Sequence, residues 1–137
     1  DVAEWVDAQI GTTDDYLAKI PFREQIKKRL EELWNYEKFS SPTREGDFYY
    51  FFRNDGLQNQ SVMYRQKGLD GEAEVFLDPN TFSEDGTVAY AGGDFSKDGK
   101  YFAYQVTESG SDWRNIYVMD VATKQLIADS IKWAKFT

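Results

Sequence analysis

The chain has 137 residues, enough for one domain or a small domain with an appendage, and 41% of the residues are hydrophobic. It contains no histidine and no cysteine, which excludes a complete Ser–His–Asp or Cys–His catalytic unit, disulfide bonds and cysteine-based zinc sites. A formal net charge of −8 without a basic stripe argues against nucleic acid and an anionic membrane surface as partners.

Membrane and compartment signals are weak along the whole sequence. No apolar run reaches the roughly 18 residues that a transmembrane helix needs. No signal peptide is visible, but the chain starts at Asp1 rather than at a methionine, so we expect that its natural start was removed. The sequence therefore leaves the compartment open between cytoplasm and periplasm.

The first predicted elements are helices within residues 1–37. Trp5, Val6 and Ile10 can share one helical face, and Pro21 then interrupts the pattern at a place that suits the first turn of a new helix. The second helix repeats apolar residues at three- and four-residue spacing: Phe22, Ile26, Leu30, Leu33 and Trp34. This amphipathic stripe predicts packing against a partner surface.

From about residue 38 to residue 137, β-type runs replace the helical period. Four Asp-Gly dipeptides lie among them and predict hairpins, because tight turns need positive φ: Asp55-Gly56, Asp70-Gly71, Asp85-Gly86 and Asp98-Gly99. The predicted strands are 48–53, 62–66, 73–77, 88–91, 101–106 and 116–121. The pattern predicts antiparallel β-sheet.

The β region repeats itself after a shift of 54 residues, which places Phe48 on Phe102, Tyr50 on Tyr104 and Val62 on Ile116. Four strands per unit at a period near 50 residues predict about two antiparallel four-stranded β-propeller blades, at about 38–80 and 86–131. Two unrelated hairpins remain the alternative. Closed rings have about 4–8 blades, so we expect the chain to be cut at its C-terminus.

Several segments resemble the prolyl oligopeptidase family, in the family's order and over nearly the whole chain: 16–23, 33–36, 54–60, 77–80, 95–101 and 108–113. The resemblance implies a piece of an enzyme that joins an α/β-hydrolase peptidase domain to a seven-bladed β-propeller. This chain then corresponds to the N-terminal helices and the first blades. The serine, aspartate and histidine of the family lie in the peptidase domain, and no Gly-x-Ser-x-Gly elbow is present here.

The loop from Ser109 to Trp113 is the main candidate site. By residue type it is a polar hairpin loop in which serine and aspartate bond nearby backbone. The resemblance implies that Asp112 lies on the propeller face toward the peptidase domain, where it supports the arginines that hold substrate. Asp112 would then act through electrostatics rather than catalysis, and Trp113 would pack at the same surface.

No motif predicts a metal or a cofactor. Residues 54–60 do not match the calcium-loop pattern, and Gly92-Gly93-Asp94 lacks the lysine of a phosphate loop. The aromatic run 48–52 is nearly continuous, which favours a strand buried on both faces over an exposed stacking platform for a sugar or peptide.

The resulting hypothesis is the N-terminal propeller fragment of a prolyl oligopeptidase-like serine peptidase, inactive alone, that gates and scaffolds the parent enzyme. Its expected partners are the missing peptidase domain and, through the parent, proline-containing peptides. Self-association through uncovered apolar surface is also expected. The alternative is a free-standing, non-enzymatic β-propeller-like binding or assembly module.

Overall fold

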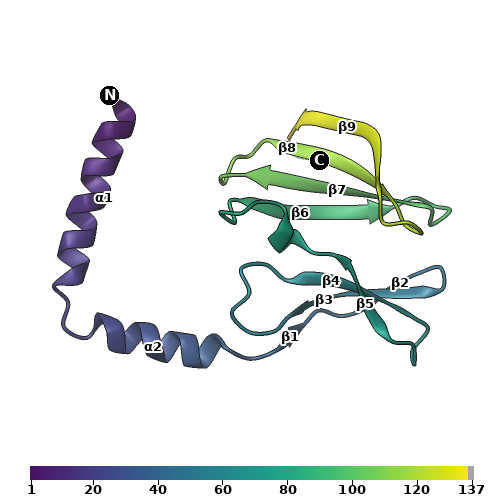
Figure 1. Ribbon diagram of the computed structural model, residues 1–137, viewed down its shortest axis with the longest axis horizontal. Helices are drawn as coiled ribbons and strands as arrows, with labels where there is room; N and C mark the ends of the chain where they lie inside the picture. The colour runs from purple at the N-terminus through teal and green to yellow at the C-terminus, as the bar shows by residue number, and fades with distance from the viewer. Residues whose placement is uncertain (136–137) are drawn as a thin grey trace. The chain divides into compact units, whose positions relative to one another are not determined.

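A computed structural model describes residues 1–135, which form two compact units, Asp1–Tyr36 and a second unit that begins at Glu37. In the described residues, the first unit is helical and the second is built mainly from β-strands (Figure 1). No helix in residues 1–135 is long and apolar enough to cross a membrane. The predicted fold class, mainly β with an N-terminal helical segment, is confirmed.

The helical unit contains α1 (Val2–Ala18) and α2 (Arg23–Trp34). Helix α1 begins with a capping box in which the Asp1 carboxylate accepts a hydrogen bond from the backbone nitrogen of Ala3 at 2.7 Å. The Glu4 side chain reaches back to the N-cap backbone, so donors that the helix leaves unpaired find partners.

Pro21 separates the two helices, but not in the predicted position. The prediction that it lies in the first turn of the second helix is wrong, because Phe22 is the N-cap and Pro21 lies in the turn before it. A proline disfavours helical geometry in the residue before it, so the chain breaks here. No side chain of either helix is buried, and Ile26, Leu30 and Leu33 are about half exposed.

The β unit starts with an antiparallel sheet in the order β1-β3-β4-β5, in which β2 also pairs with β3. Strands β1 and β2 pair with successive parts of β3 and so together take the place of one interrupted strand. The strands are β1 (Lys38–Phe39), β2 (Thr43–Glu45), β3 (Phe48–Asn54), β4 (Val62–Lys67) and β5 (Ala73–Leu77).

The second sheet is antiparallel in the order β6-β7-β8-β9. Its strands are β6 (Val88–Phe95), β7 (Tyr101–Glu108), β8 (Arg114–Asp120) and β9 (Leu126–Ala134), and the 3-10 turn η1 (Pro79–Thr81) lies on the connection from the first sheet. Each sheet thus has the four sequential positions of a propeller blade.

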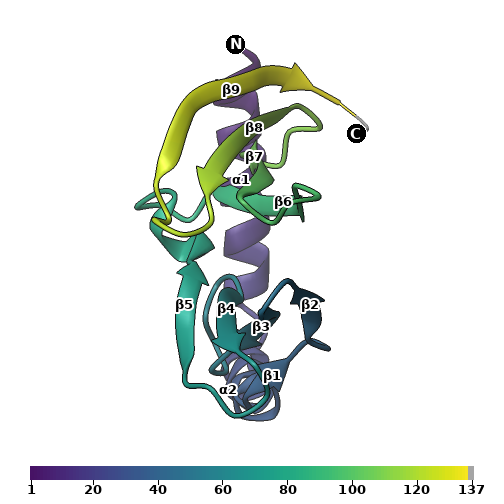
Figure 2. The ribbon, with the colours of Figure 1, turned by 90° about the vertical axis from the view of Figure 1, so that its right-hand side faces the viewer.

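The two sheets lie beside each other and share one core (Figures 1 and 2). The buried members come from both sheets: Tyr50, Met63, Phe76, Leu77, Phe102, Tyr104, Val106, Met119 and Val121. Phe102 is 1% exposed, and its ring centroid lies 5.5 Å from that of Phe76 in the other sheet. The aromatic residues that repeat along the sequence therefore bind one blade to the next.

The 54-residue repeat corresponds to equivalent strands of the two sheets. Phe48 and Tyr50 lie in β3, and their counterparts Phe102 and Tyr104 lie in β7. The same shift relates β4 to β8 and β5 to β9. The prediction of two four-stranded blades is confirmed, and the alternative of two unrelated hairpins is not supported.

The Asp-Gly dipeptides lie in hairpins, as predicted, at three of four positions, although Gly71 does not take the positive φ on which the prediction rested. The dipeptides 55–56, 70–71 and 98–99 lie between paired antiparallel strands. The prediction of a hairpin at Asp85-Gly86 is wrong, since this dipeptide precedes β6 on the connection between the two sheets. Gly86 has φ of 70°, so the dipeptide marks a positive-φ turn without specifying what the turn connects.

The aromatic strand β3 is covered unequally on its two faces. Tyr50 is 4% exposed in the shared core, as the burial prediction requires. The opposite face is only partly covered: Phe51 is half-buried and stacks on Tyr64 at a centroid distance of 5.8 Å. Burial on both faces is therefore wrong for the described residues, because the second sheet packs on one face of β3.

Candidate functional site

The candidate loop connects β7 to β8 and is organised by its own polar groups. Ser109 and Gly110 take left-handed φ of 49° and 73°, which reverses the chain. The backbone nitrogen of Ser111 donates to the carbonyl of Glu108 at 2.9 Å, and the Thr107 hydroxyl donates to the Ser111 carbonyl at 2.7 Å. The loop is therefore a hydrogen-bonded turn, as its residue types predict.

Asp112 points away from this network. Its side chain is 71% exposed, and its Oδ2 lies 3.3 Å from Lys135 Nζ. An exposed ion pair of this kind contributes little to stability, about 0–1 kcal/mol. Asp112 is thus an exposed carboxylate at the surface. In residues 1–135 its charged partner is a lysine rather than an arginine.

Trp113 lies beside a second tryptophan that sequence reasoning missed. Its ring centroid is 5.8 Å from that of Trp133 in β9, at an interplanar angle of 80°. Lys135 Nζ lies 5.2 Å from the centroid of Trp113, a cation–π distance. Asp112, Trp113, Trp133 and Lys135 therefore form one exposed cluster, named here the tryptophan cluster.

Trp133 and Lys135 could not be placed by their spacing in the sequence. They reach the loop because β9 pairs with β8, so that Arg114 lies opposite Ala134. The pairing is irregular here: its register shifts between Arg114 and Ile116, and Trp133 takes φ of 61°. The one available signal was the alternating apolar run after Ile131, which indicates a strand but not its partner.

A pocket of about 550 Å³ adjoins the tryptophan cluster. Its lining combines two indoles and a phenol with amide, hydroxyl and charged groups: Glu108, Ser109, Ser111, Trp113, Asn115, Tyr117, Lys132 and Trp133. Asn115 Nδ2 donates to Glu108 Oε1 at 3.0 Å, which orients one carboxylate of the wall. The chain has no histidine, so this pocket contains no Ser–His pair.

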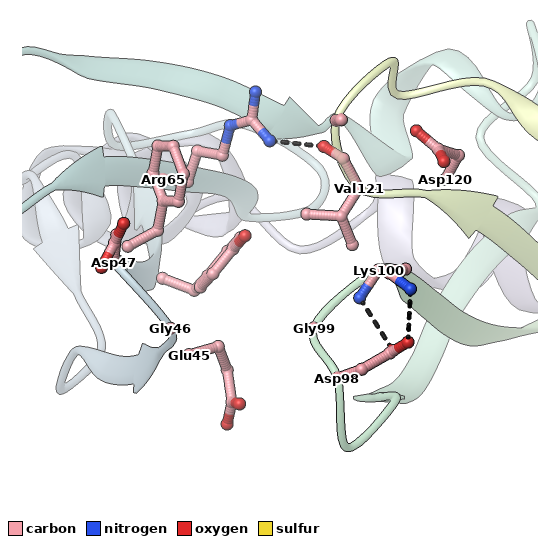
Figure 3. A pocket seen from close by; sticks show the side chains of 12 residues that line it. Glu45, Gly46, Asp47, Arg65, Asp98, Gly99, Lys100, Asp120 and Val121 are labelled. Carbon is pink, nitrogen blue, oxygen red and sulfur yellow. Dashed lines mark hydrogen bonds and ion pairs between the residues drawn. The ribbon is translucent and has the colours of Figure 1, made fainter.

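A second pocket, of about 630 Å³, opens between the two sheets at the end away from this loop (Figure 3). Arg65 of β4 lies at its wall and is 8% exposed. Its Nη1 donates to the Val121 carbonyl at 2.5 Å, and its Nε donates to Glu74 Oε1 at 2.6 Å. The guanidinium also lies 4.9 Å from the ring centroid of Phe48. Arg65 therefore links the two sheets.

Four carboxylates line this second pocket, from Glu45, Asp47, Asp98 and Asp120. The Ser96 hydroxyl, with the backbone and side chain of Lys100, lowers the pKa of Asp98. Hydrogen bonds from the backbone and hydroxyl of Thr123 lower the pKa of Asp120. These two acids stabilise their own turns. Within residues 1–135 no three His, Cys, Asp or Glu side chains are placed to hold a metal ion.

The sequence match decides the family. Residues 1–137 match the family model described as the prolyl oligopeptidase N-terminal beta-propeller domain. The chain belongs to this family. It is 50% identical over 137 residues to the prolyl endopeptidase of Elizabethkingia miricola, covering 100% of this chain and 19% of that protein. It is 35% identical to the dual function macrocyclase-peptidase POPB of Amanita bisporigera, covering 100% of this chain and 22% of that protein.

Solved structures agree with this assignment. A chain from a structural analysis of two prolyl endopeptidases matches with a TM-score of 0.89 at 31% identity, over 96% of this chain and 20% of that chain. Substrate-bound prolyl oligopeptidase B from Galerina marginata matches with a TM-score of 0.86 at 34% identity, over 99% of this chain and 22% of that chain. The chain thus spans about a fifth of the length of these relatives. The resemblance predicted from the ordered segments is confirmed.

Proposed function

We propose that this chain forms the N-terminal helices and first two propeller blades of a serine peptidase that hydrolyses peptides after proline. The 50% identity to a prolyl endopeptidase over all 137 residues carries the proposal. In it, residues 1–37 are the helical segment and 38–137 the partial propeller, with blade-like repeats at about 38–80 and 86–131. A peptidase domain is the partner that supplies serine, aspartate and histidine, and this chain supplies gating surface and scaffold.

The tryptophan cluster is the part of the chain that we assign to the substrate side. Asp112 is an exposed carboxylate on a loop held by its own hydrogen bonds, a geometry suited to orienting an arginine of the partner domain. Trp113 is 48% exposed and meets Trp133 edge to face, which leaves aromatic surface for a proline-containing peptide. Asp112 acts in this proposal through binding and not through proton transfer.

The family match sets aside a module without peptidase ancestry. If the chain had a non-enzymatic binding role, it could not replace its counterpart in an active enzyme. A chimera therefore distinguishes a role as part of a peptidase from a binding role alone. In it, the 19% of the Elizabethkingia miricola prolyl endopeptidase that aligns with this chain is replaced by this chain.

We expect the chimera to cleave a chromogenic prolyl peptide with kcat/KM within about tenfold of the unmodified relative, in a serine-inhibitor-sensitive reaction. The chain alone, assayed in parallel, should show no turnover because it has no histidine. A folded but inactive chimera would contradict the proposal. Inhibitor-sensitive activity that stays with the purified chain alone would contradict its non-catalytic role.

A further inference from the structure

We propose that Asp70 is a site of spontaneous isomerisation to isoaspartate, and that the fold protects the chain's other three Asp-Gly dipeptides from this reaction. The chain carries four such dipeptides, the sequence context in which this reaction meets least steric hindrance. The structure distinguishes them by the hydrogen bonds of two groups, the aspartate carboxyl and the following amide nitrogen.

The reaction needs only these two groups and water. The amide nitrogen of Gly71 loses its proton and attacks the protonated side-chain carboxyl carbon of Asp70. A carbon–nitrogen bond forms, a carbon–oxygen bond breaks, and water leaves, which closes a five-membered succinimide. Water then adds to either ring carbonyl. When it opens the ring at the original main-chain carbonyl, the main chain continues through the former side chain as isoaspartate, and the net mass is unchanged.

Hydrogen bonds occupy the reacting groups at two protected sites. Asp85 Oδ1 accepts from the backbone nitrogen and hydroxyl of Thr87 at 3.0 and 2.8 Å. Asp98 Oδ1 accepts from the Ser96 hydroxyl at 2.7 Å, and the Gly99 nitrogen donates to the Ser96 carbonyl at 2.8 Å. The same bonds lower the pKa of both carboxyls, which depletes the protonated acid that reacts.

The Asp55-Gly56 dipeptide is protected at its nucleophile. Gly56 is buried, and its amide nitrogen donates to the side-chain oxygen of Asn54 at 3.0 Å. The backbone nitrogen of Asp55 also donates to Gln58 Oε1 at 3.1 Å. Ring closure at this site requires the loop to open first, and local opening of a hydrogen-bonded loop costs free energy.

Asp70 lacks this protection. It is exposed in the hairpin between β4 and β5, and within residues 1–135 its carboxylate accepts no hydrogen bond and forms no ion pair. The hairpin also needs the glycine, because a Cβ on Gly71 would lie 2.2 Å from the carbonyl oxygen of Lys67. The backbone geometry therefore requires a glycine, the following residue that hinders the reaction least, directly after the least protected aspartate.

Conversion at Asp70 has a structural consequence. Isoaspartate inserts a methylene into the backbone of the hairpin that leads into β5. This strand carries Glu74, which bonds Arg65 and lies 3.0 Å from Lys124 of the other sheet. Isomerisation should therefore weaken the link between the two blades.

Ageing the chain with and without urea tests the proposal. The folded chain and the chain in urea are incubated at physiological temperature, and isoaspartate is located at each dipeptide by enzymatic methylation and electron-transfer mass spectrometry. In urea all four sites should convert at similar rates. In the folded chain Asp70 should convert about tenfold faster than any other site, since two protein hydrogen bonds must first break at a protected one.

Two substitutions at this exposed position complete the test. Asp70→Glu should abolish the signal at position 70, because its ring would have six members and closes far more slowly. Asp70→Asn should increase it, because ammonia leaves through the same ring. Faster or equal conversion at 55, 85 or 98 in the folded chain would overturn the proposal. So would an unconverted position 70 under conditions in which the urea sample converts.

Discussion

The loops β3–β4 and β7–β8 occupy equivalent positions in two neighbouring blades, yet they direct their polar groups in opposite ways. Where the first loop begins, Asn54, the last residue of β3, is 7% exposed, and its side chain bonds the Gln58 carbonyl and the Gly56 nitrogen. In the second loop Asp112 and Trp113 point to the surface. The first loop thus uses the buried Asn54 side chain for its own hydrogen bonds, whereas the second loop exposes a charge and an indole.

Gln60 extends this contrast at the end of the first loop. Its Nε2 donates to the Val88 carbonyl at 2.9 Å, and its Oε1 accepts from the Tyr90 nitrogen at 2.9 Å, so it ties the first sheet to β6 of the second. Equivalent loops of neighbouring blades can therefore serve either stability or recognition.

Removing the Gln60 side chain should give the largest loss of stability among these predictions. Gln60→Ala leaves the partly buried Tyr90 nitrogen and Val88 carbonyl unpaired, so we expect a loss of about 2–3 kcal/mol in the free energy of unfolding. Asn59→Ala in the same loop removes one long bond from an exposed amide and should cost under about 0.5 kcal/mol. Urea unfolding measures both. Equal costs would remove the distinction between the two neighbours.

Changing Asp112 should affect activity rather than stability. In the active chimera, Asp112→Asn should lower kcat/KM by about tenfold, or about 1.4 kcal/mol, because a paired guanidinium loses its carboxylate. The unfolding midpoint should stay unchanged, since the exposed pair with Lys135 contributes little. Unchanged kinetics across substrates and pH would remove Asp112 from the candidate site.

The exposed apolar side chains of the helical unit lead to a third prediction, which concerns self-association. Its side chains Ile26, Leu30 and Leu33 are each about 50% exposed. We expect the chain to self-associate at high micromolar concentration, because apolar contact outweighs the screened repulsion of a −8 charge. Light scattering over a concentration series should show growing mass, and Leu30→Glu should reduce it. A folded monomer at every concentration would contradict the expectation.

The smallest expected effect is the pH dependence of stability that comes from Glu74. Hydrogen bonds from Arg65, and then from Lys124, lower the pKa of Glu74 below its ordinary value of 4.5. A depressed acid pKa stabilises the fold above that value, and the contribution is lost as pH falls through the depressed pKa. Unfolding midpoints of the native chain and Glu74→Gln should therefore differ near neutrality and converge in acid. A constant difference would exclude this ion pair as the cause.

The blade repeat could be predicted because its signal is local. Apolar residues alternate along 102–106, and the aromatic run 48–52 is nearly continuous. The glycines of three of the four Asp-Gly dipeptides, Gly56, Gly86 and Gly99, take the positive φ that tight turns need. The helices were equally readable from their apolar spacing. The errors at Pro21 and Asp85-Gly86 share one physical cause. A residue's backbone preference restricts its own dihedrals and those of its neighbour, but it does not specify which elements the turn joins.

By itself, the sequence determined the family, the helical and β regions, the two blades and the absence of a histidine for catalysis. It also singled out Asp112 and Trp113 as candidate site residues, because they lie together in an ordered motif. Only the tertiary structure added Trp133 and Lys135, which strand pairing brings from more than a dozen residues away along an irregular β9. It alone distinguished Gln60 and Arg65 as links between blades. Such long-range contacts depend on strand register and on packing between sheets, which local residue patterns do not encode.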